Sequence, residues 1–413
     1  MTPEPQTFRI AVRKFGPFES AMEKLWASFC EHLGCQLQAE MVPMDLHPLH
    51  TSLLTDNGLR KGTWDVAHIN TDWLLEAYSA GALENIAPYL AQNPPADFPQ
   101  GWSQSLLGMQ QYGDDVAGLP FHDGPECLIY RKDLFEDPAE QAKFQRQHGK
   151  PLQPPQTWDD FHTVARFFHR PAQNRYGTIV AAYPDGHNTV FDFCLQLWSR
   201  GGKLVDAQGR VQINTPEAKA GLAFYRALLH DQTAIHPSSG TYESVQAGLA
   251  FMRGEAAMMI NWFGFASMCE VDEASQVKGK VDITTIPQGE GGKPCSLNVY
   301  WLYAIGAGSQ HKQTAYDFIR FAINPQNDKL LTLEGGIGCR LSTWHDAEIN
   351  ATVPYYHKLA LLHEQAESLP QKSNWAQIAA IIDEVVLQAT GTEHDIEKLL
   401  AAGQSKINSL EHV

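Results

Sequence analysis

The sequence predicts an α/β protein with two lobes. Short apolar segments alternate with segments of helical apolar periodicity from residue 8 to residue 80, and the alternation restarts near residue 115. This alternation is typical of mainly parallel sheets with helices on both faces. The length of 413 residues exceeds the roughly 100–200 residues of an ordinary domain, so we expect more than one hydrophobic core.

The first lobe begins with a predicted strand at 8–13, which ends at the turn formed by Gly16 and Pro17. Ser20 and Glu23 have the spacing of a capping box and predict the start of a helix. The apolar positions of this helix are Met22, Leu25, Trp26, Phe29 and Leu33. The next predicted elements are a strand at 36–41, a helix at 49–59, a strand at 65–69 and a helix at 73–80.

The second lobe repeats this pattern. Thr157 is placed to cap a helix whose Trp158, Phe161, Val164, Ala165 and Phe168 share one face. The predicted strands here and further on are 115–120, 126–130, 256–261, 281–286 and 299–305. The predicted helices are 216–229, 242–253, 312–322 and a tail at 375–407.

The charge of the chain excludes two classes of partner. Acidic residues outnumber basic ones by 47 to 31, which gives a formal net charge of −16. A surface this negative repels phosphate backbones and anionic lipid headgroups, so nucleic acid and membrane surfaces are poor partners. The longest apolar runs are interrupted by charged pairs, Arg253 with Glu255 and Asp383 with Glu384, so we predict no membrane span.

The seven cysteines do not predict a disulfide framework, because they are sparse and odd in number, and their pairing stays open. No Cys/His spacing suits zinc. Residues 1–6 lack the pattern of a signal peptide. Both a chain whose leader was removed and a chain that was never exported are therefore open.

A series of short motifs follows in order between Asp65 and Leu341. They are DVA at 65–67 with Trp73, GAL at 81–83 with IAPYL at 86–90, GLP at 118–120, IYRKDLF at 129–135, PQTWDDF at 155–161, GGKL at 201–204 with NTPE at 214–217, FMRGEAAM at 251–258, and AYDFIRF at 315–321 with Gly335 and Gly336. This series resembles the family 1 extracellular solute-binding proteins of ABC importers, the maltose- and glycerol-phosphate-binding group. One departure is Val299-Tyr300-Trp301, where the family commonly has Gly-Gly-Trp.

The resemblance implies a type II periplasmic-binding-protein fold, in which the chain crosses between the lobes three times, near 120–126, 285–288 and 324–329. Lobe 1 would then hold residues 1–122 and 286–325, and lobe 2 residues 123–285 and 326–413, with the ligand cleft between them. The implied function is the substrate-binding component of an ABC importer for a carbohydrate or related polyol, which works by hinge closure without chemistry. The implied partners are permease subunits, and the location is periplasmic or at the cell surface. We expect a monomer.

Sugar binding needs aromatic faces and planar polar side chains, and open α/β sheets bind ligands beyond their strand ends. Trp262, which follows the strand at 256–261, is the main aromatic candidate. Of Tyr300 and Trp301, only one can face the ligand, because neighbouring strand residues point to opposite faces. The predicted ligand-binding residues are Lys14, Phe15, Asn70, Asp72, Trp73, His122, Asp123, Asp185, His187, Asn261, Trp262, Tyr300, Trp301 and Arg340.

Most of these residues also have an ordinary structural interpretation. Asp72 could cap a helix, Asp185 with Gly186 could form a turn, and Trp262 could pack in a core. His122 and Asp123 lack further ligands at useful spacing, so we predict no metal and no cofactor. Catalytic motifs such as Gly-x-Ser-x-Gly and His-Glu-x-x-His are absent from the sequence. A sugar-active α/β enzyme and a sensor domain are the alternatives to a transport protein.

Overall fold

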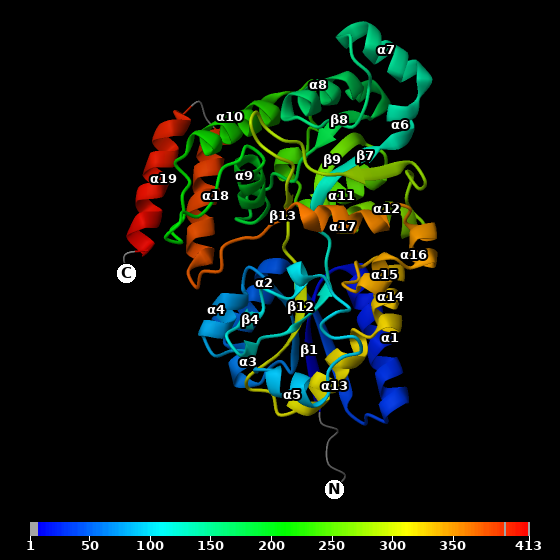
Figure 1. The fold of residues 1–413 in the computed structure, drawn as a ribbon, viewed down its shortest axis with the longest axis vertical. Helices are drawn as coiled ribbons and strands as arrows, with labels where there is room; N and C mark the ends of the chain where they lie inside the picture. The colour runs from blue at the N-terminus through cyan, green and yellow to red at the C-terminus, as the bar shows by residue number, and fades with distance from the viewer. Residues whose placement is uncertain (1–6, 392–393, 412–413) are drawn as a thin grey trace. The chain divides into compact units, whose positions relative to one another are not determined.

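The computed structural model describes residues 7–391 and 394–411, and these divide into two units. Unit 1 contains residues 7–124, 299–357 and 371–373. Unit 2 contains the other described residues, 125–298, 358–370 and 374–411. The predicted α/β class is confirmed, since each unit is built on a sheet with helices around it (Figure 1).

The main sheet of unit 1 has the strand order β2-β1-β3-β12-β6. These strands are β1 (Thr7–Arg13), β2 (Gln38–Met44), β3 (Val66–Asn70), β6 (Leu119–His122) and β12 (Trp301–Ile305). β1 is parallel to β2 and β3, whereas β12 is antiparallel to both of its neighbours. β4 (Gln111–Tyr112) and β5 (Asp115–Val116) form a separate hairpin. The sheet is thus mainly parallel, with β12 inserted in the reverse direction.

The helices of unit 1 are α1 (Gly16–Leu33), α2 (Leu46–His50), α3 (Gly58–Lys61), α4 (Leu74–Ser79), α5 (Ala87–Gln92), α13 (Lys312–Ala322), α14 (Pro325–Leu333), α15 (Leu341–Trp344) and α16 (Ala347–Thr352). The helix predicted at 49–59 is divided into α2, a π-helical turn at Thr51–Thr55 and α3. The break lies at Asn57, whose φ of 58° is left-handed and ends the preceding turn. Turns of 3-10 helix lie at Gln104–Leu106 in unit 1, at Pro171–Gln173 and Ser239–Thr241 in unit 2, and at Tyr356–Lys358 where the chain passes between the units.

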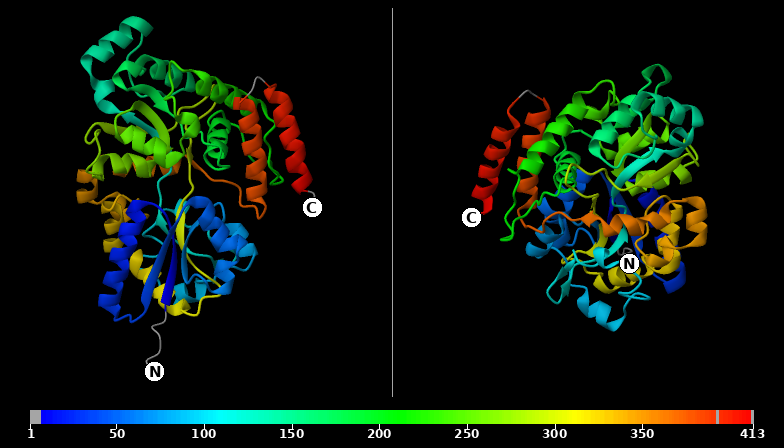
Figure 2. Two further views of the ribbon diagram at one scale, coloured as in Figure 1. Left: turned by 180° about the vertical axis from the view of Figure 1, so that it is seen from behind. Right: turned by 45° about the horizontal axis from the view of Figure 1, so that its top comes forward.

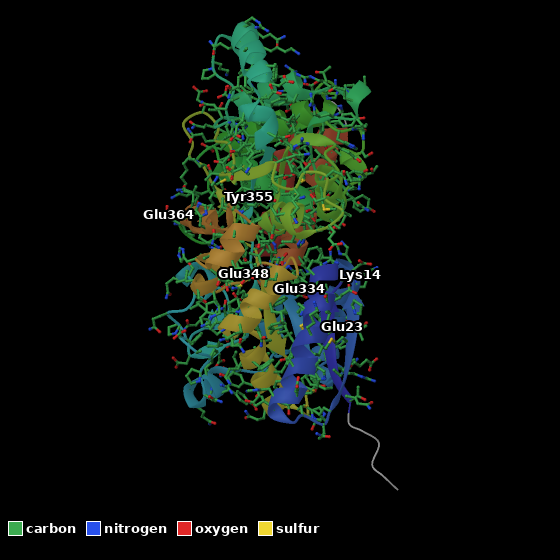
Figure 3. The ribbon with its side chains drawn as sticks, turned by 90° about the vertical axis from the view of Figure 1, so that its right-hand side faces the viewer. Lys14, Glu23, Glu334, Glu348, Tyr355 and Glu364 are labelled. Carbon is green, nitrogen blue, oxygen red and sulfur yellow. The ribbon has the colours of Figure 1, made fainter. Side chains whose placement is uncertain are left out.

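Helix α1 packs its apolar stripe into the core of unit 1. Trp26 stacks on Phe8 of β1 with ring centroids 4.8 Å apart, and Leu33 is 51% exposed at the helix end. The predicted capping box at Ser20 is wrong, because the helix already begins at Gly16, where Pro17 supplies a preset φ. Ser20 instead donates a hydrogen bond of 2.6 Å to Glu334, which follows α14 and lies beside α1 (Figure 3).

The main sheet of unit 2 has the strand order β10-β7-β9-β8. Its strands are β7 (Glu126–Arg131), β8 (Tyr176–Ile179), β9 (Ala256–Trp262) and β10 (Val281–Thr284). β8 and β9 are parallel, and β7 is antiparallel to both β9 and β10. The pair β11 (Ser296–Leu297) and β13 (Ala366–Glu367) lies outside this sheet. β7 is therefore the reversed strand here, as β12 is in unit 1.

The helices of unit 2 are α6 (Lys132–Glu136), α7 (Pro138–His148), α8 (Trp158–Phe168), α9 (Asn188–Trp198), α10 (Pro216–His230), α11 (Ser244–Met252), α12 (Phe263–Val271), α17 (Leu359–Glu364), α18 (Trp375–Gly391) and α19 (Ile396–Glu411). The Thr157 side chain accepts a hydrogen bond from the Asp160 backbone N–H, so the predicted cap of α8 is confirmed. The predicted tail at 375–407 forms two helices, α18 and α19, which pack against each other and against α10 (Figure 2).

The boundaries of the units differ from the predicted lobes in two long segments and two short ones, 123–124 and 371–373. Residues 326–357 belong to unit 1, where the Ile337 N–H donates to His122 and the Arg340 guanidinium donates to the Ala96 carbonyl. Residues 286–298 belong to unit 2, where Gln288 pairs with Gln156 and the β11 strand pairs with β13. The chain passes between units after residues 124, 298 and 357, and 371–373 return to unit 1.

Candidate functional site

The sheet of unit 1 brings several predicted residues to one edge. Asn70 ends β3 and pairs with Trp301, and Trp301 pairs with His122 at the end of β6. Lys14 follows the last residue of β1, which is parallel to β3. We call Lys14, Asn70, His122 and Trp301 rim 1. Because the carboxyl ends of these parallel strands meet here, rim 1 is the edge at which an open α/β sheet binds ligands.

Lys14 is the exposed cation of rim 1 (Figure 3). Its ammonium nitrogen lies 3.6 Å from an Asp45 carboxylate oxygen, and its backbone N–H donates to the Met44 carbonyl. Phe15 precedes helix α1 and meets Phe18 at a ring-centroid distance of 5.0 Å. Lys14 is therefore available to solvent at the edge, whereas Phe15 lies partly against the core.

Two tryptophans lie together beside the end of β3. Asn70 accepts a hydrogen bond of 3.2 Å from the Asp72 N–H, which turns the chain into helix α4. Trp73 is only 7% exposed and contacts the Trp301 ring edge-on, with the centroids 5.7 Å apart. His50 covers Trp73 from another side at 5.1 Å. Trp301 is the more accessible of the two rings, and Trp73 supports it.

Tyr300 does not take part in this edge. Its side chain is fully buried, and its hydroxyl donates a hydrogen bond of 2.7 Å to the side-chain oxygen of Gln110. Gln110 is itself buried, so the phenol has a partner inside unit 1. The prediction that Tyr300 contacts ligand is therefore corrected. Tyr300 is a packing residue of unit 1, and its neighbour Trp301 is the aromatic residue of rim 1.

His122 and Asp123 fasten the loop around Ile337 to the end of β6. The Ile337 N–H donates to the His122 Nδ1 at 2.9 Å, and the Asp123 N–H donates to the Ile337 carbonyl at 2.9 Å. Burial lowers the pKa of His122 to about 4, so the ring is a neutral hydrogen-bond acceptor. Among the described residues no group of three or more His, Cys, Asp or Glu side chains is arranged to hold a metal ion.

Arg340 is also placed differently from the prediction. It is 1% exposed, and its guanidinium donates to the carbonyls of Ala96 and Ile323 at 2.7 and 3.0 Å. The same group lies 4.2 Å from the centre of the Trp102 ring. Arg340 thus connects separate segments inside unit 1. This correction removes it from the set of ligand-binding candidates.

The sheet of unit 2 presents a second edge of the same kind. Trp262 ends β9 and pairs with Glu126, the first residue of β7. The Trp262 ring is partly exposed and meets Phe191 of α9 edge-on, with the centroids 5.5 Å apart. We call Glu126, Phe191 and Trp262 rim 2. Trp262 is therefore an aromatic group at a strand end, as the sequence predicted.

The polar candidates near rim 2 serve the backbone. Asn261 is buried, and its amide donates to the Ser244 carbonyl at 2.9 Å. Asp185 accepts from the backbone N–H groups of His187 and Asn188 at 2.8 and 3.0 Å, which starts helix α9. The His187 ring packs on Phe191 at 4.3 Å. Asn261 and Asp185 thus hold the backbone in place near rim 2. His187 contacts Phe191, which belongs to rim 2.

Two carboxyl groups of unit 2 are absent from the predicted site: Glu126, which is buried on rim 2, and Asp192 of α9, which is half-buried. Burial, and then the neighbouring Asp192, raise the pKa of Glu126 well above its usual value. Burial also raises the pKa of Asp192 to about 7, although the Tyr225 hydroxyl donates to it at 2.6 Å. The available signal was Asp192 itself, an acid within the apolar run of α9.

After residue 124 the chain enters the sheet of unit 2 on β7, and after residue 298 it re-enters the sheet of unit 1 on β12. β12 begins at rim 1, and β7 begins at rim 2. Two α/β units of this construction, with aromatic and polar groups at those edges, define a two-lobed periplasmic binding protein. The chain belongs to the bacterial extracellular solute-binding protein family, whose model matches residues 48–329.

Known proteins resemble this chain over different lengths. A probable ABC transporter-binding protein of Deinococcus radiodurans is 24% identical over 286 residues, which cover 68% of this chain and 65% of that protein. The match thus spans slightly less than two thirds of that relative. Maltose-bound T. maritima MalE3 has a TM-score of 0.85 at 22% identity and covers 98% of this chain and 99% of that one.

A second solved structure has the same fold. It is an ABC transporter solute-binding protein of Agrobacterium radiobacter in complex with ribitol, with a TM-score of 0.85 at 24% identity. The alignment covers 98% of this chain and 100% of that chain. Within the described part of this chain, no helix has both the length and the apolar character needed to cross a membrane.

Proposed function

We propose that the chain is the solute-capturing component of an ABC importer and that it binds a neutral carbohydrate or polyol. In this proposal the ligand contacts both rims, and the two units close over it by rotation about the chain crossings. The observation that carries the proposal is the pair of tryptophans at sheet edges, Trp301 on rim 1 and Trp262 on rim 2. A tryptophan face covers the C–H surface of a sugar ring and excludes water from it.

The polar groups of the rims favour hydroxyls over charged substituents. Lys14 is the cation of rim 1, and the Asp45 carboxylate already lies 3.6 Å from it. Arg340, the other cation once expected here, is bonded inside unit 1. Burial raises the pKa of Glu126 on rim 2 well above its usual value, so this carboxyl group resists carrying a negative charge. The polar side chains of the two rims therefore offer little positive charge to a phosphate or carboxylate group. They can still form hydrogen bonds with neutral hydroxyls.

The solved relatives support the same ligand class. The T. maritima protein is bound to maltose, and the Agrobacterium protein is bound to ribitol. The D. radiodurans relative carries the name of a transporter-binding protein, which supports an importer as the partner. These proteins share the fold with our chain at identities below 25%, so the particular sugar has to come from experiment.

A thermal-shift screen identifies the ligand most directly. The probes are neutral mono- and disaccharides, linear polyols, and the phosphorylated and carboxylated forms of the same sugars. A ligand that binds only the folded state at 100 times its Kd adds about 2.7 kcal/mol of stability, so a hit raises Tm. We expect the largest shift from a neutral compound. A screen in which anionic sugars outrank every neutral one would contradict the neutral-ligand proposal.

Calorimetry and scattering then test the mechanism. Titration calorimetry should show saturable binding while chromatography recovers the sugar unchanged. Small-angle scattering should show a smaller radius of gyration at saturating ligand, because closure brings the units together. An unchanged radius at saturation would contradict closure without contradicting binding.

A further inference from the structure

The last turn of α1 and the short segment beyond its end bring two cysteines together. Gly34 has a φ of 66°, and its N–H bonds to the Cys30 carbonyl at 2.9 Å. This is the left-handed termination of a helix, which turns the chain back over its last turn. The residue after the glycine commonly contacts the residue that accepts this bond. In this chain those two residues are Cys35 and Cys30.

The two thiols are neighbours at this helix end. The Cys35 thiol lies close enough to Cys30 to help raise the pKa of the Cys30 thiol, and both residues are partly exposed. The other cysteines of the described chain are buried in the two units, at Cys127, Cys194, Cys269, Cys295 and Cys339. A small disulfide reagent therefore has access to Cys30 and Cys35 while the folded chain shields the buried thiols.

We propose that Cys30 and Cys35 form a reversible disulfide that fastens the end of α1 to the segment leading into β2. The reaction is exchange with a low-molecular-weight disulfide such as oxidised glutathione. One cysteine thiolate attacks a sulfur of that disulfide, forms a mixed disulfide and releases one glutathione thiolate. The second cysteine thiolate then attacks the bonded cysteine sulfur and releases the second glutathione. The protein loses two protons and two electrons, and the oxidised glutathione is reduced to two thiols.

The location of this pair separates it from ligand binding. Lys14 of rim 1 comes just before α1, whereas Cys30 lies in the last turn of the 18-residue helix. A helix of this length is roughly 27 Å long. Gln38, the first residue of β2, pairs with Thr7 at the amino end of β1, so the crosslink lies toward the edge opposite rim 1. The disulfide should therefore alter the α1–β2 connection and leave the rim unchanged.

The protonation of Cys30 governs the rate of closure. Burial and the adjacent Cys35 thiol raise the pKa of Cys30 to about 11. The thiolate is the attacking species, so the closing step should accelerate as the pH rises toward that value. Oxidation at pH 8 should run several-fold faster than oxidation at pH 7.

Alkylation and mass spectrometry of the folded, full-length protein test the proposal. The reduced protein should take up iodoacetamide at Cys30 and Cys35, and all seven cysteines should react in urea. After incubation with oxidised glutathione, the folded protein should lose roughly 2 Da, the mass of two hydrogens, and resist alkylation at both positions. Peptide mapping should place the link between residues 30 and 35. Dithiothreitol should restore both thiols.

Single-cysteine variants are the matched control. Cys30→Ser and Cys35→Ser each leave one accessible thiol, which can only retain one glutathione as a mixed disulfide. Two results would overturn the proposal. One is a wild-type protein that retains glutathione on both cysteines without closing the link. The other is a protein whose two thiols alkylate at the same rate before and after oxidation.

Discussion

The titratable groups near the sheet edges differ between the two units: unit 1 has histidines with lowered pKa values, and unit 2 has carboxyl groups with raised pKa values. Burial lowers the pKa of His68 to about 3 and that of His122 to about 4, so both rings are neutral. Burial raises the pKa of Glu126 well above its usual value and that of Asp192 to about 7. Burial disfavours charge in both cases, but a base responds by losing its proton and an acid by keeping it.

The difference gives the two units opposite responses to pH. Lowering the pH charges the unfolded form of a buried base before the folded form, so unit 1 loses stability in acid. Raising the pH ionises the unfolded form of a buried acid first, so unit 2 loses stability toward alkali. Unit 1 also contains the buried acid Asp328, whose pKa is raised to about 6, so variants are needed to separate the contributions.

The largest effect should come from Arg340→Ala, which tests whether this residue belongs to the interior of unit 1. Removing the guanidinium leaves the Ala96 and Ile323 carbonyls without their donor, and each such loss costs about 1–3 kcal/mol. We expect unit 1 to lose about 3 kcal/mol or more. Hydrogen exchange of peptides from each unit, measured across a urea series, reports the loss by unit.

Arg210→Ala is the control for this variant. Arg210 forms an exposed ion pair with Asp206 in unit 2, and such pairs often contribute nothing measurable. If Arg340→Ala abolished ligand binding while leaving unit 1 as stable as wild type, Arg340 would return to the binding site and our correction would be wrong.

Asp192→Asn should flatten the pH response of unit 2. The folded pKa of about 7 lies above the ordinary value of 3.8, so the folded state binds the extra proton and stability falls as the pH rises. By linkage the wild type should lose about 2–3 kcal/mol between pH 5 and pH 8 through this group. Asparagine cannot ionise, and it can still accept the Tyr225 hydroxyl.

Urea unfolding at pH 5, 6.5 and 8, resolved by hydrogen exchange in unit 2, measures this response. Asp206→Asn is the matched control, because hydrogen bonds from the Arg210 backbone and side chain lower the pKa of that carboxyl group, so its loss should leave the alkaline response unchanged. An Asp192→Asn protein with the wild-type slope would show that Asp192 is not buried as an acid in solution.

His122→Asn tests the predicted loss of stability of unit 1 in acid. The folded pKa of about 4 lies below the ordinary value of 6.5, so stability is present above pH 6.5 and is lost as the pH falls toward 4. One such histidine should cost about 2 kcal/mol between pH 7 and pH 5. The asparagine oxygen can accept the Ile337 N–H in place of Nδ1, so the loop contact is retained.

The same urea series at pH 7 and pH 5 reads out this prediction. The contribution of Asp328 is common to wild type and variant, so it cancels in the difference between them. The variant should lose less stability in acid than the wild type, and the difference should appear in peptides of unit 1 alone. Equal losses would place the acid sensitivity of unit 1 elsewhere.

Trp262→Ala compares the two rims as binding surfaces. Losing a central aromatic anchor typically costs about 2 kcal/mol, or roughly 30-fold in affinity. We expect at least that loss in titration calorimetry with the ligand from the screen, and a fold that survives because the ring is partly exposed. Trp301→Ala is the corresponding change on rim 1. If Trp262→Ala bound as well as wild type, or unfolded, Trp262 would be a packing residue and Trp301 the main anchor.

The sequence predicted the α/β class and most elements because apolar periodicity and capping residues are local signals. Thr157 before α8 is an example, since its hydroxyl caps the helix next to it. The capping box at Ser20 failed because the turn at Gly16 and Pro17 had already started the helix. Ser20 was then bonded to Glu334, which is 314 positions away in the sequence and leaves no local signal.

The site was predictable only to the level of strand ends. Trp262, Asn70 and Lys14 lie at the edges where the strand-end rule placed them. Trp301, which was predicted inside a strand, begins β12 at the same edge as Asn70. The rule did not predict that the Tyr300 hydroxyl points inward and donates to Gln110. It also did not predict that the Arg340 guanidinium donates to the carbonyls of Ala96 and Ile323. Both outcomes depend on long-range contacts, which neither periodicity nor spacing records.

The position of β12 in the sheet of unit 1 sets an order of events during synthesis. β12 lies between β3 and β6, yet residues 301–305 are made after every strand of the unit 2 sheet, which ends at Thr284. The ribosome therefore releases every strand of the main sheet of unit 2 while β3 and β6 of unit 1 still lack the strand that pairs between them. Open edges are where strands mispair. The main sheet whose first strand is synthesised first is therefore the main sheet that is completed last.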